Sequence, residues 1–341
     1  MTLADYDYDL PVAAIAQAPP ETRDGARLLV IDRAAGTLAD RHVADLPALL
    51  RPGDCLVVND SRVIPARVLV EDAAGRPVEL LFLEPVTPSR WRALVRPGRR
   101  CRPGARLSVG DARLEVFAAD DDGARVVELA GGRVEDLLAA HGLPPLPPYI
   151  ARHAKPAAED WERYQTVYAR EPGSVAAPTA GLHLSAALLD GLRARAIEIH
   201  AVTLHVGPAT FRPVTAASAE AHALPPERAT VSAATAAAVT TARRQGRRVV
   251  AVGTTVTRTL ESAATAEGTV APLDGHATVT IRPGHRFRAV DALLTNFHLP
   301  RSSLLILVAA FAGRERILAA YRHAVAGGYR FYSYGDATLI Q

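Results

Sequence analysis

Cysteine is scarce in this chain of 341 residues, where only Cys55 and Cys101 occur. Two thiols outside any Cys-x-x-Cys pair build neither a disulfide framework nor a four-cysteine zinc site, and no other metal-ligand set is present, so we expect no metal. The longest apolar run, residues 304–312, is far shorter than the roughly 20 residues that cross a bilayer. The first residues also lack the basic region of a signal peptide. These absences predict a reduced, cytoplasmic protein with no membrane partner.

An excess of charge of either sign is also missing, since 39 basic and 36 acidic residues leave a net charge of +3. A surplus this small permits a nucleic-acid partner but does not argue for one, because a local basic face would matter more. Hydrophobic residues make up 49% of the chain, which predicts a globular protein.

Four apolar runs end in a short burst of polar residues. Such runs predict buried strands of a parallel sheet, and ligands bind outside the carboxyl ends of these strands. We therefore expect one shared active site at these four ends. The polar segments are Asn59-Asp60-Ser61-Arg62, His205-Val206-Gly207, Gly253-Thr254-Thr255 and Thr295-Asn296-Phe297-His298.

Residues 63–148 differ from the rest of the chain in that they are rich in short strand-like segments. Short β-like stretches separated by turns run from residue 63 to residue 129, and a proline-rich segment follows at 143–148. Many short strands with regular turns predict a small barrel. After residue 150, helix and strand patterns alternate. We expect an α/β (α+β) major domain, formed by residues 1–62 and 149–341, with an inserted small all-β barrel domain at 63–148.

Other segments allow two interpretations each. The loop at 173–184 either faces a ligand or is an ordinary connection, and residues 331–336 alternate either as a ligand-stacking strand or as a half-buried edge strand. The arginines of 96–106 and 243–248 either hold phosphates or form a solvated surface. The run 304–312 is either a strand or a buried helix. A lone His205 is either a site residue or a hydrogen-bonded core residue.

Several blocks resemble, in order, the S-adenosylmethionine:tRNA ribosyltransferase-isomerase family of queuosine biosynthesis. The most specific is Val175-Ala176-Ala177-Pro178-Thr179-Ala180-Gly181-Leu182-His183. The others are Asn59 through Arg67, Leu146-Pro147-Pro148-Tyr149-Ile150, Tyr164-Gln165-Thr166-Val167-Tyr168, Thr203-Leu204-His205-Val206-Gly207, Thr295 through Pro300 and Tyr332 through Ala337.

The resemblance implies a reaction and a set of site residues. Enzymes of this family transfer a ribose-derived unit from S-adenosylmethionine to 7-aminomethyl-7-deazaguanine in tRNA, giving epoxyqueuosine, adenine and methionine. We expect S-adenosylmethionine as co-substrate, tRNA as partner and a monomer. The catalytic candidates are His183, His205, His298, Asp60 and Asp336. The binding candidates are Asn59, Arg62, Thr179, Gly181, Gly207, Thr210, Gly253, Thr254, Thr255, Arg258, Asn296, Phe297, Tyr332 and Tyr334.

The chain departs from the family pattern at a few positions. Pro208 and Ala209 replace a segment that usually contains glycine, Val256 replaces a serine, Pro225 replaces a histidine, and Leu184 replaces an aromatic residue. Two alternatives therefore stay open. One is an enzyme that uses the same sulfonium chemistry on a small-molecule acceptor, and the other is an RNA-binding relative without catalytic activity.

Overall fold

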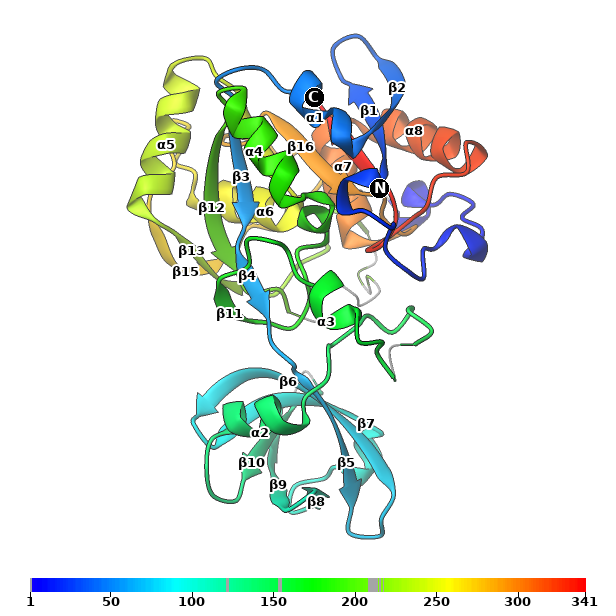
Figure 1. The fold of residues 1–341 in the computed structure, drawn as a ribbon, viewed down its shortest axis with the longest axis vertical. Coiled ribbons are helices and arrows are strands. Elements are labelled where there is room, and N and C mark those ends of the chain that lie inside the picture. The colour runs from blue at the N-terminus through cyan, green and yellow to red at the C-terminus, as the bar shows by residue number, and fades with distance from the viewer. Residues whose placement is uncertain (1, 121–122, 153–154, 208–213, 215, 217) are drawn as a thin grey trace. The chain divides into compact units, whose positions relative to one another are not determined.

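The protein is described by a computed structural model that covers residues 2–341 apart from 121–122, 153–154, 208–213, 215 and 217. The chain divides into two compact units. One unit, here called the sheet unit, comprises residues 1–61, 166–170 and 178–341, and the other, the barrel unit, comprises residues 62–165 and 171–177. Figure 1 shows a mixed sheet with helices in the first and a closed barrel in the second. The predicted fold class is therefore confirmed.

The sheet unit is built on a nine-stranded sheet in the order β15-β13-β12-β3-β14-β16-β17-β1-β2. Strands β12, β3, β14 and β16 run parallel, whereas β17 runs antiparallel to β16. The bounds are β1 (Arg27–Asp32), β2 (Thr37–His42), β3 (Cys55–Asn59), β12 (Glu198–Leu204), β13 (Glu227–Val231), β14 (Val249–Val252), β15 (Leu273–Ala277), β16 (Ala292–Asn296) and β17 (Ala337–Ile340).

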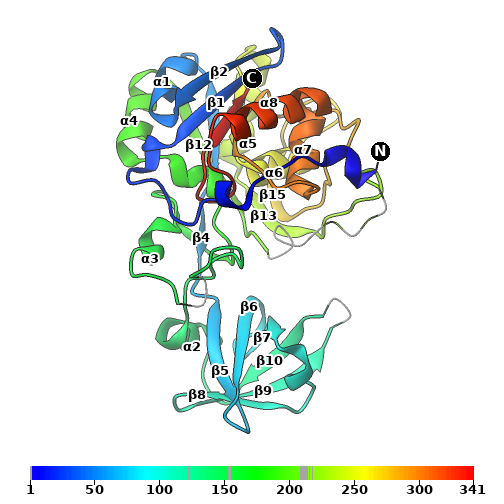
Figure 2. The same cartoon turned by 90° about the vertical axis from the view of Figure 1, so that its right-hand side faces the viewer.

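Helices cover both faces of this sheet, as Figure 2 shows. Because successive strand residues point to opposite faces and both faces are covered, the central strands β3, β14 and β16 are apolar up to their carboxyl ends. Val57 of β3 packs with the helices of one face, whereas Val58 packs with those of the other. The first face carries α5 (Ala233–Arg244), α6 (Thr254–Ala263), α7 (Ser303–Ala312) and α8 (Arg314–Ala326), and the second carries α1 (Leu46–Leu49), α4 (Ala186–Ala194) and the 3₁₀ helix η6 (Thr179–His183).

Side-chain caps begin several helices of the sheet unit, and one ambiguity of the sequence is settled. The apolar run at 304–312 is the buried helix α7, which begins at the N-cap Ser302. Ser185 and Ser232 cap α4 and α5 through their side chains, because a hydroxyl oxygen accepts an otherwise unsatisfied backbone N–H.

The barrel unit contains six antiparallel strands closed in the order β10-β7-β6-β5-β8-β9. Alternate residues such as Val68, Leu80 and Val116 fill its interior, and α2 packs against the same core. The bounds are β5 (Arg67–Asp72), β6 (Pro77–Thr87), β7 (Arg90–Arg96), β8 (Arg106–Val109), β9 (Ala112–Ala119), β10 (Arg125–Leu129) and α2 (Val134–His141). The remaining elements include β4 (Ser61–Val63), which pairs with β11 (Glu171–Ser174), and α3 (Asp160–Arg163).

Candidate active site at the carboxyl edge of the sheet

The polar ends of the four parallel strands lie on one edge of the sheet. The register aligns Asn59 of β3 with Val202 of β12, and Val252 of β14 with Leu294 of β16. Strand β17 is antiparallel and begins at this edge, where Ala337 lies opposite Asn296. The segment before β17 therefore joins the strand ends of the sheet unit.

Asn59 links two of these strands through its side chain. Its Oδ1 accepts from the backbone N–H of Leu204 at 3.0 Å, and its Nδ2 donates to the Leu204 carbonyl at 3.0 Å and to Thr255 Oγ1 at 3.5 Å. Asn59 thus extends the backbone ladder between β3 and β12 with a side chain.

Asp60 is held by two partners from other segments. One carboxylate oxygen accepts from Thr203 Oγ1 at 2.7 Å, and the other from Arg170 at 2.6 Å. The carboxylate is 3% exposed, so the ion pair with Arg170 compensates a charge that burial would otherwise disfavour.

His183 and Asn296 form a buried pair at the edge. Asn296 Nδ2 lies 3.0 Å from His183 Nε2 and donates to the Tyr332 carbonyl at 3.1 Å. Since an amide nitrogen has only hydrogens to offer, His183 Nε2 accepts and the ring proton resides on Nδ1. Burial and the charge of Arg330 lower the pKa of His183 to about 4, so the ring is neutral at pH 7. Asn296 Oδ1 is buried and accepts no hydrogen bond from the described part of the chain.

His298 is also buried and follows the end of β16. Its Nε2 lies 3.1 Å from Thr295 Oγ1, and burial lowers its pKa to about 3. Its neighbour Phe297 has no exposed surface and packs against Tyr321 and Phe331, with ring centroids 5.2 and 4.8 Å away. The structure thus places Phe297 in an aromatic core of the sheet unit.

His205 begins the loop after β12 and is only partly buried. The backbone N–H of Gly207 donates to Glu227 Oε1 at 2.9 Å, and Glu227 Oε2 accepts from Arg258 at 2.5 Å. Arg258 also donates to the carbonyls of Pro225 and Val279. Arg258 therefore supports the loop through Glu227, and its charge is already paired. Thr210 lies outside the described residues.

The segment 331–336 is a turn and not the alternating strand that the sequence allowed. Tyr332 adopts φ 75°, a region that residues with a side chain rarely occupy. Its N–H donates to the Phe297 carbonyl at 3.1 Å, which helps to hold this conformation. Asp336 accepts from the backbone N–H groups of Arg27 at 2.9 Å and Arg330 at 2.7 Å. Tyr334 is 2% exposed.

Two glycines at the candidate site resist substitution for different reasons, one for lack of space and one for its backbone conformation. A Cβ on Gly181 would lie 2.1 Å from the Tyr168 hydroxyl, so only glycine fits in η6. Gly253 has φ 94° and precedes α6, whose first residues Thr254 and Thr255 follow the end of β14. Their N–H groups lie at a helix N-terminus, which favours hydrogen-bond acceptors. Thr179 is partly exposed at the start of η6, whereas Arg62 belongs to the barrel unit and is exposed there.

Comparison with known proteins identifies the family. Residues 3–340 match the family model of the queuosine biosynthesis protein. The chain belongs to this family. Among its relatives are proteins named S-adenosylmethionine:tRNA ribosyltransferase-isomerase from Symbiobacterium thermophilum, 52% identical over 100% of both chains, and from Anaeromyxobacter dehalogenans, 53% identical over 100% of this chain and 99% of the relative.

A solved structure agrees with the assignment to the queuosine biosynthesis family. The S-adenosylmethionine tRNA ribosyltransferase of Thermotoga maritima matches with a TM-score of 0.58 and 33% identity, covering 99% of this chain and 100% of that one. The resemblance drawn from the sequence blocks is thereby confirmed. Relatives that match over nearly their whole length at 33–53% identity all bear the name of the transferase, which favours the transferase over both alternatives kept open above.

The structure describes some of the positions at which the chain departs from the family pattern. Val256 is fully buried in the core of the sheet unit, away from solvent. Pro225 contributes its carbonyl to Arg258 at 2.6 Å, a contact that any residue could make. Pro208 and Ala209 lie outside the described residues.

Some site residues were missed from the sequence. Glu227, Thr203 and Arg170 hold Gly207 and Asp60, yet none of them was singled out as a site residue. Tyr168 packs on Gly181 and belongs to the family-like block Tyr164-Gln165-Thr166-Val167-Tyr168, so the resemblance could have indicated it.

Two further observations concern metals and membranes. In the described ranges, no three His, Cys, Asp or Glu side chains are grouped so that they could hold a metal ion. No helix in the described part of the chain combines the length and apolar character needed to span a bilayer.

Proposed function

We propose that this chain is an S-adenosylmethionine:tRNA ribosyltransferase-isomerase. The reaction joins the ribose-derived unit of S-adenosylmethionine to the aminomethyl group of 7-aminomethyl-7-deazaguanine in tRNA. Adenine and methionine leave, the sulfonium charge disappears as methionine departs as a thioether, and one proton is released as the amine becomes alkylated. The observation that carries the proposal is the convergence of strand ends on one edge in a chain whose residues 3–340 match this family.

S-adenosylmethionine binds, in this proposal, along the edge formed by η6, the start of α6 and the Asn296 turn. Asn296 Oδ1 is a buried acceptor, and it suits an N–H or O–H donor such as the adenine amino group or a ribose hydroxyl. The α6 N–H groups favour acceptors such as the ring nitrogens of adenine, whose departure needs hydrogen-bond support. Tyr332 and Tyr334 flank the substrate from the turn before β17.

His205 is the proposed general base that removes a proton from the ribose 5′ carbon next to the sulfonium. Burial depresses the pKa of His183 to about 4 and of His298 to about 3, which makes both rings weak bases. His205 is partly exposed and sits on a loop supported by Glu227. The buried rings then serve as neutral hydrogen-bonding groups that fix Asn296 and Thr295.

Asp60 and Asp336 are proposed to position the site and not to transfer protons. Each carboxylate already accepts hydrogen bonds from two described residues. Holding both substrates together matters, because orientation supplies roughly 7–11 kcal/mol of such a barrier. The proposal also includes a monomer and a cytoplasmic location.

A direct assay tests the reaction. The protein is mixed with S-adenosylmethionine and tRNA carrying the aminomethyl-deazaguanine base, and mass spectrometry follows adenine, methionine and the modified nucleoside. We expect all three products in equal amounts with tRNA and far less with the free base. Product formation from the free base alone would reject the tRNA acceptor, and no adenine release from either would reject the chemistry.

A matched pair of variants tests the base. We expect His205→Ala to lower kcat by roughly 10²–10⁴-fold, the usual contribution of a positioned base, with a smaller change in the KM for S-adenosylmethionine. His200→Ala, in strand β12 that precedes the His205 loop, is the control and should retain activity. Near-normal turnover of His205→Ala would refute this role.

A further inference from the structure

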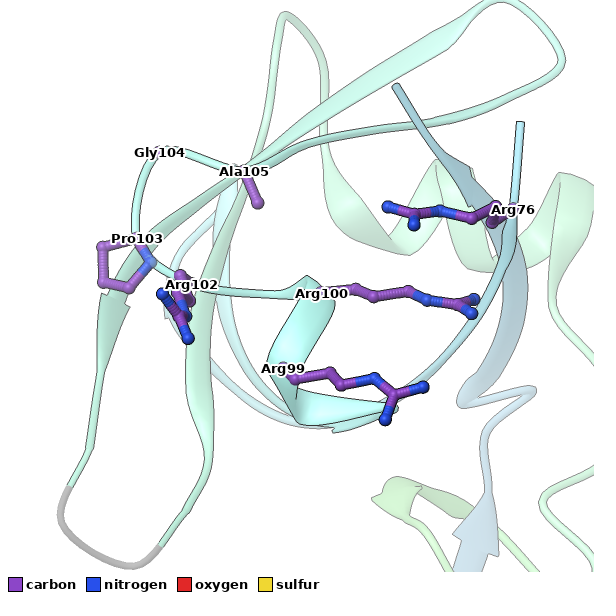
Figure 3. A pocket seen from close by; sticks show the side chains of 7 residues that line it. All are labelled: Arg76, Arg99, Arg100, Arg102, Pro103, Gly104 and Ala105. Atoms are coloured by element: carbon purple, nitrogen blue, oxygen red, sulfur yellow. The ribbon is translucent and has the colours of Figure 1, made fainter. Parts of the chain in front are cut away.

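A basic feature of the barrel unit is formed by residues that have no assigned part in the chemistry. Residues 96–106 contain five arginines and no acidic residue. A cavity of about 630 Å³ opens beside this segment, as Figure 3 shows. It is here called the arginine pocket, and it is lined by Arg76, Arg99, Arg100, Arg102, Pro103, Gly104 and Ala105.

The backbone that presents these arginines is well anchored. Residues Gly98–Arg100 form the 3₁₀ helix η5, and Cys101 after it is fully buried in the barrel core. Arg125 Nε donates to the Cys101 carbonyl at 2.9 Å, and Gly104 N–H donates to the Val116 carbonyl at 2.8 Å. The pocket is therefore a fixed feature of the barrel surface.

The charges of the pocket are largely uncompensated. Arg76 pairs with Asp72 at 2.8 Å, and Arg100 donates to the neutral Pro77 carbonyl at 3.0 Å. Arg99 and Arg102 are exposed and pair with no carboxylate of the described residues. Three of the four guanidinium groups thus have no acidic partner in the described structure.

Other arginines of the barrel unit behave differently. Arg90 pairs with Glu128 at 3.1 Å, and Arg92 pairs with Glu84 and Asp120 at 2.5 and 2.7 Å. Even within residues 96–106, the two arginines on strands lie opposite acids, because Arg96 aligns with Glu79 and Arg106 with Glu115. The arginines of the connection that forms the pocket thus differ from these strand arginines, which have a carboxylate beside them.

We propose that the arginine pocket binds backbone phosphates of the tRNA substrate. Guanidinium groups form paired, charge-assisted hydrogen bonds with phosphate oxygens. The lining offers no aromatic ring, carboxylate or amide, and its guanidinium donors suit the acceptor oxygens of phosphates, contacts that fix the position of the RNA. The inference rests on the proposed function for the identity of the RNA.

The test compares a double variant with a control that has the same charge. Arg99→Ala/Arg102→Ala removes two charges from the pocket, and Arg113→Ala/Arg133→Ala removes two exposed charges elsewhere in the barrel unit. Binding of tRNA lacking the target base is measured by fluorescence anisotropy from 50 to 300 mM salt. This assay does not depend on turnover, so the proposal of phosphate binding in the pocket can be refuted independently of the proposed reaction.

Each lost phosphate contact should reduce the slope of log K against log salt by about 0.7–0.9. Loss of two contacts should therefore reduce the slope by about 1.4–1.8 and weaken binding roughly 25- to 60-fold at 0.1 M salt. We expect the control to keep the wild-type slope, and Arg99→Lys/Arg102→Lys to recover most of it, because lysine retains the charge.

The outcome also separates the pocket from the active site. With tRNA carrying the aminomethyl-deazaguanine base, the pocket variant should raise the KM for tRNA while kcat and the KM for S-adenosylmethionine stay unchanged. A wild-type affinity and slope in the folded pocket variant, or an equal loss in the control, would overturn the proposal. Wild-type protein that binds tRNA through the pocket but releases no adenine would instead refute the proposed function.

Discussion

Acid should destabilise this protein through two buried histidines. Free histidine has a pKa near 6.5, whereas burial lowers the pKa of His183 to about 4 and of His298 to about 3. Between pH 6.5 and these folded values, the unfolded chain binds protons that the folded chain does not. Stability is therefore complete above pH 7 and falls as the pH drops through 6.5.

The size of the effect follows from proton linkage. Each unit of pH below 6.5 costs about 1.4 kcal/mol per histidine until the folded pKa is reached. Between pH 7.5 and pH 5, each ring should therefore cost about 2 kcal/mol, and the two together about 4 kcal/mol. This is a large part of the 5–15 kcal/mol by which typical domains are stable.

The assay is urea unfolding of wild type, His183→Asn and His298→Asn at pH 5, 6, 7 and 7.5. Other groups also titrate, so the quantity of interest is the difference in unfolding free energy between wild type and variant at each pH. At pH 7.5 we expect each variant to have a lower free energy of unfolding than wild type. At pH 5 this difference between wild type and variant should be about 2 kcal/mol smaller. A gap that stays constant across this range would show that the ring is not buried in a neutral state, and the reasoning would fail.

Three further outcomes are expected. Glu227→Gln should destabilise the protein by about 3–5 kcal/mol in urea unfolding, because it leaves Arg258 buried without a counter-charge, and adding Arg258→Met should recover much of the loss. Gly181→Ala should impair activity because its Cβ would lie 2.1 Å from the Tyr168 hydroxyl; Tyr168→Phe should partly rescue it, and equal inactivity of the double variant would contradict this account. Asp336→Asn should lower the free energy of unfolding by about 1–3 kcal/mol in thermal or urea unfolding, because the amide nitrogen cannot accept a hydrogen bond from a backbone N–H. Unchanged stability would refute the stabilising role of the two hydrogen bonds to Asp336.

The sequence predicts the parts of the site that local pattern determines. A buried apolar strand ending in Asn59 or Asn296 is visible as a short run followed by polar residues, and strand direction then brings such ends to one edge. Helix caps such as Ser185 are equally local, because the hydroxyl bonds a backbone N–H three residues later.

The unpredicted parts depend on distant contacts or on backbone conformation. Arg258 meets a carboxylate 31 residues away in the chain, so the sequence alone left it free to bind a ligand. Phe297 is apolar in a polar block, and only packing against Tyr321 assigns it to the core. The alternation around Tyr332 suggested a strand, but hydrogen bonds from separate segments impose a turn.

The position of β3 in the sheet has a consequence for synthesis on the ribosome. Residues 55–59 emerge early, yet their two neighbours, β12 and β14, begin only at residues 198 and 249. The contiguous stretch 62–165 of the barrel unit is translated in the interval and has its own core. Because long-range pairing must wait for its partners, a nascent chain can complete the barrel while the apolar strand β3 of the sheet unit is still unpaired along its edge. That edge is where a ribosome-associated chaperone would be most useful to this protein.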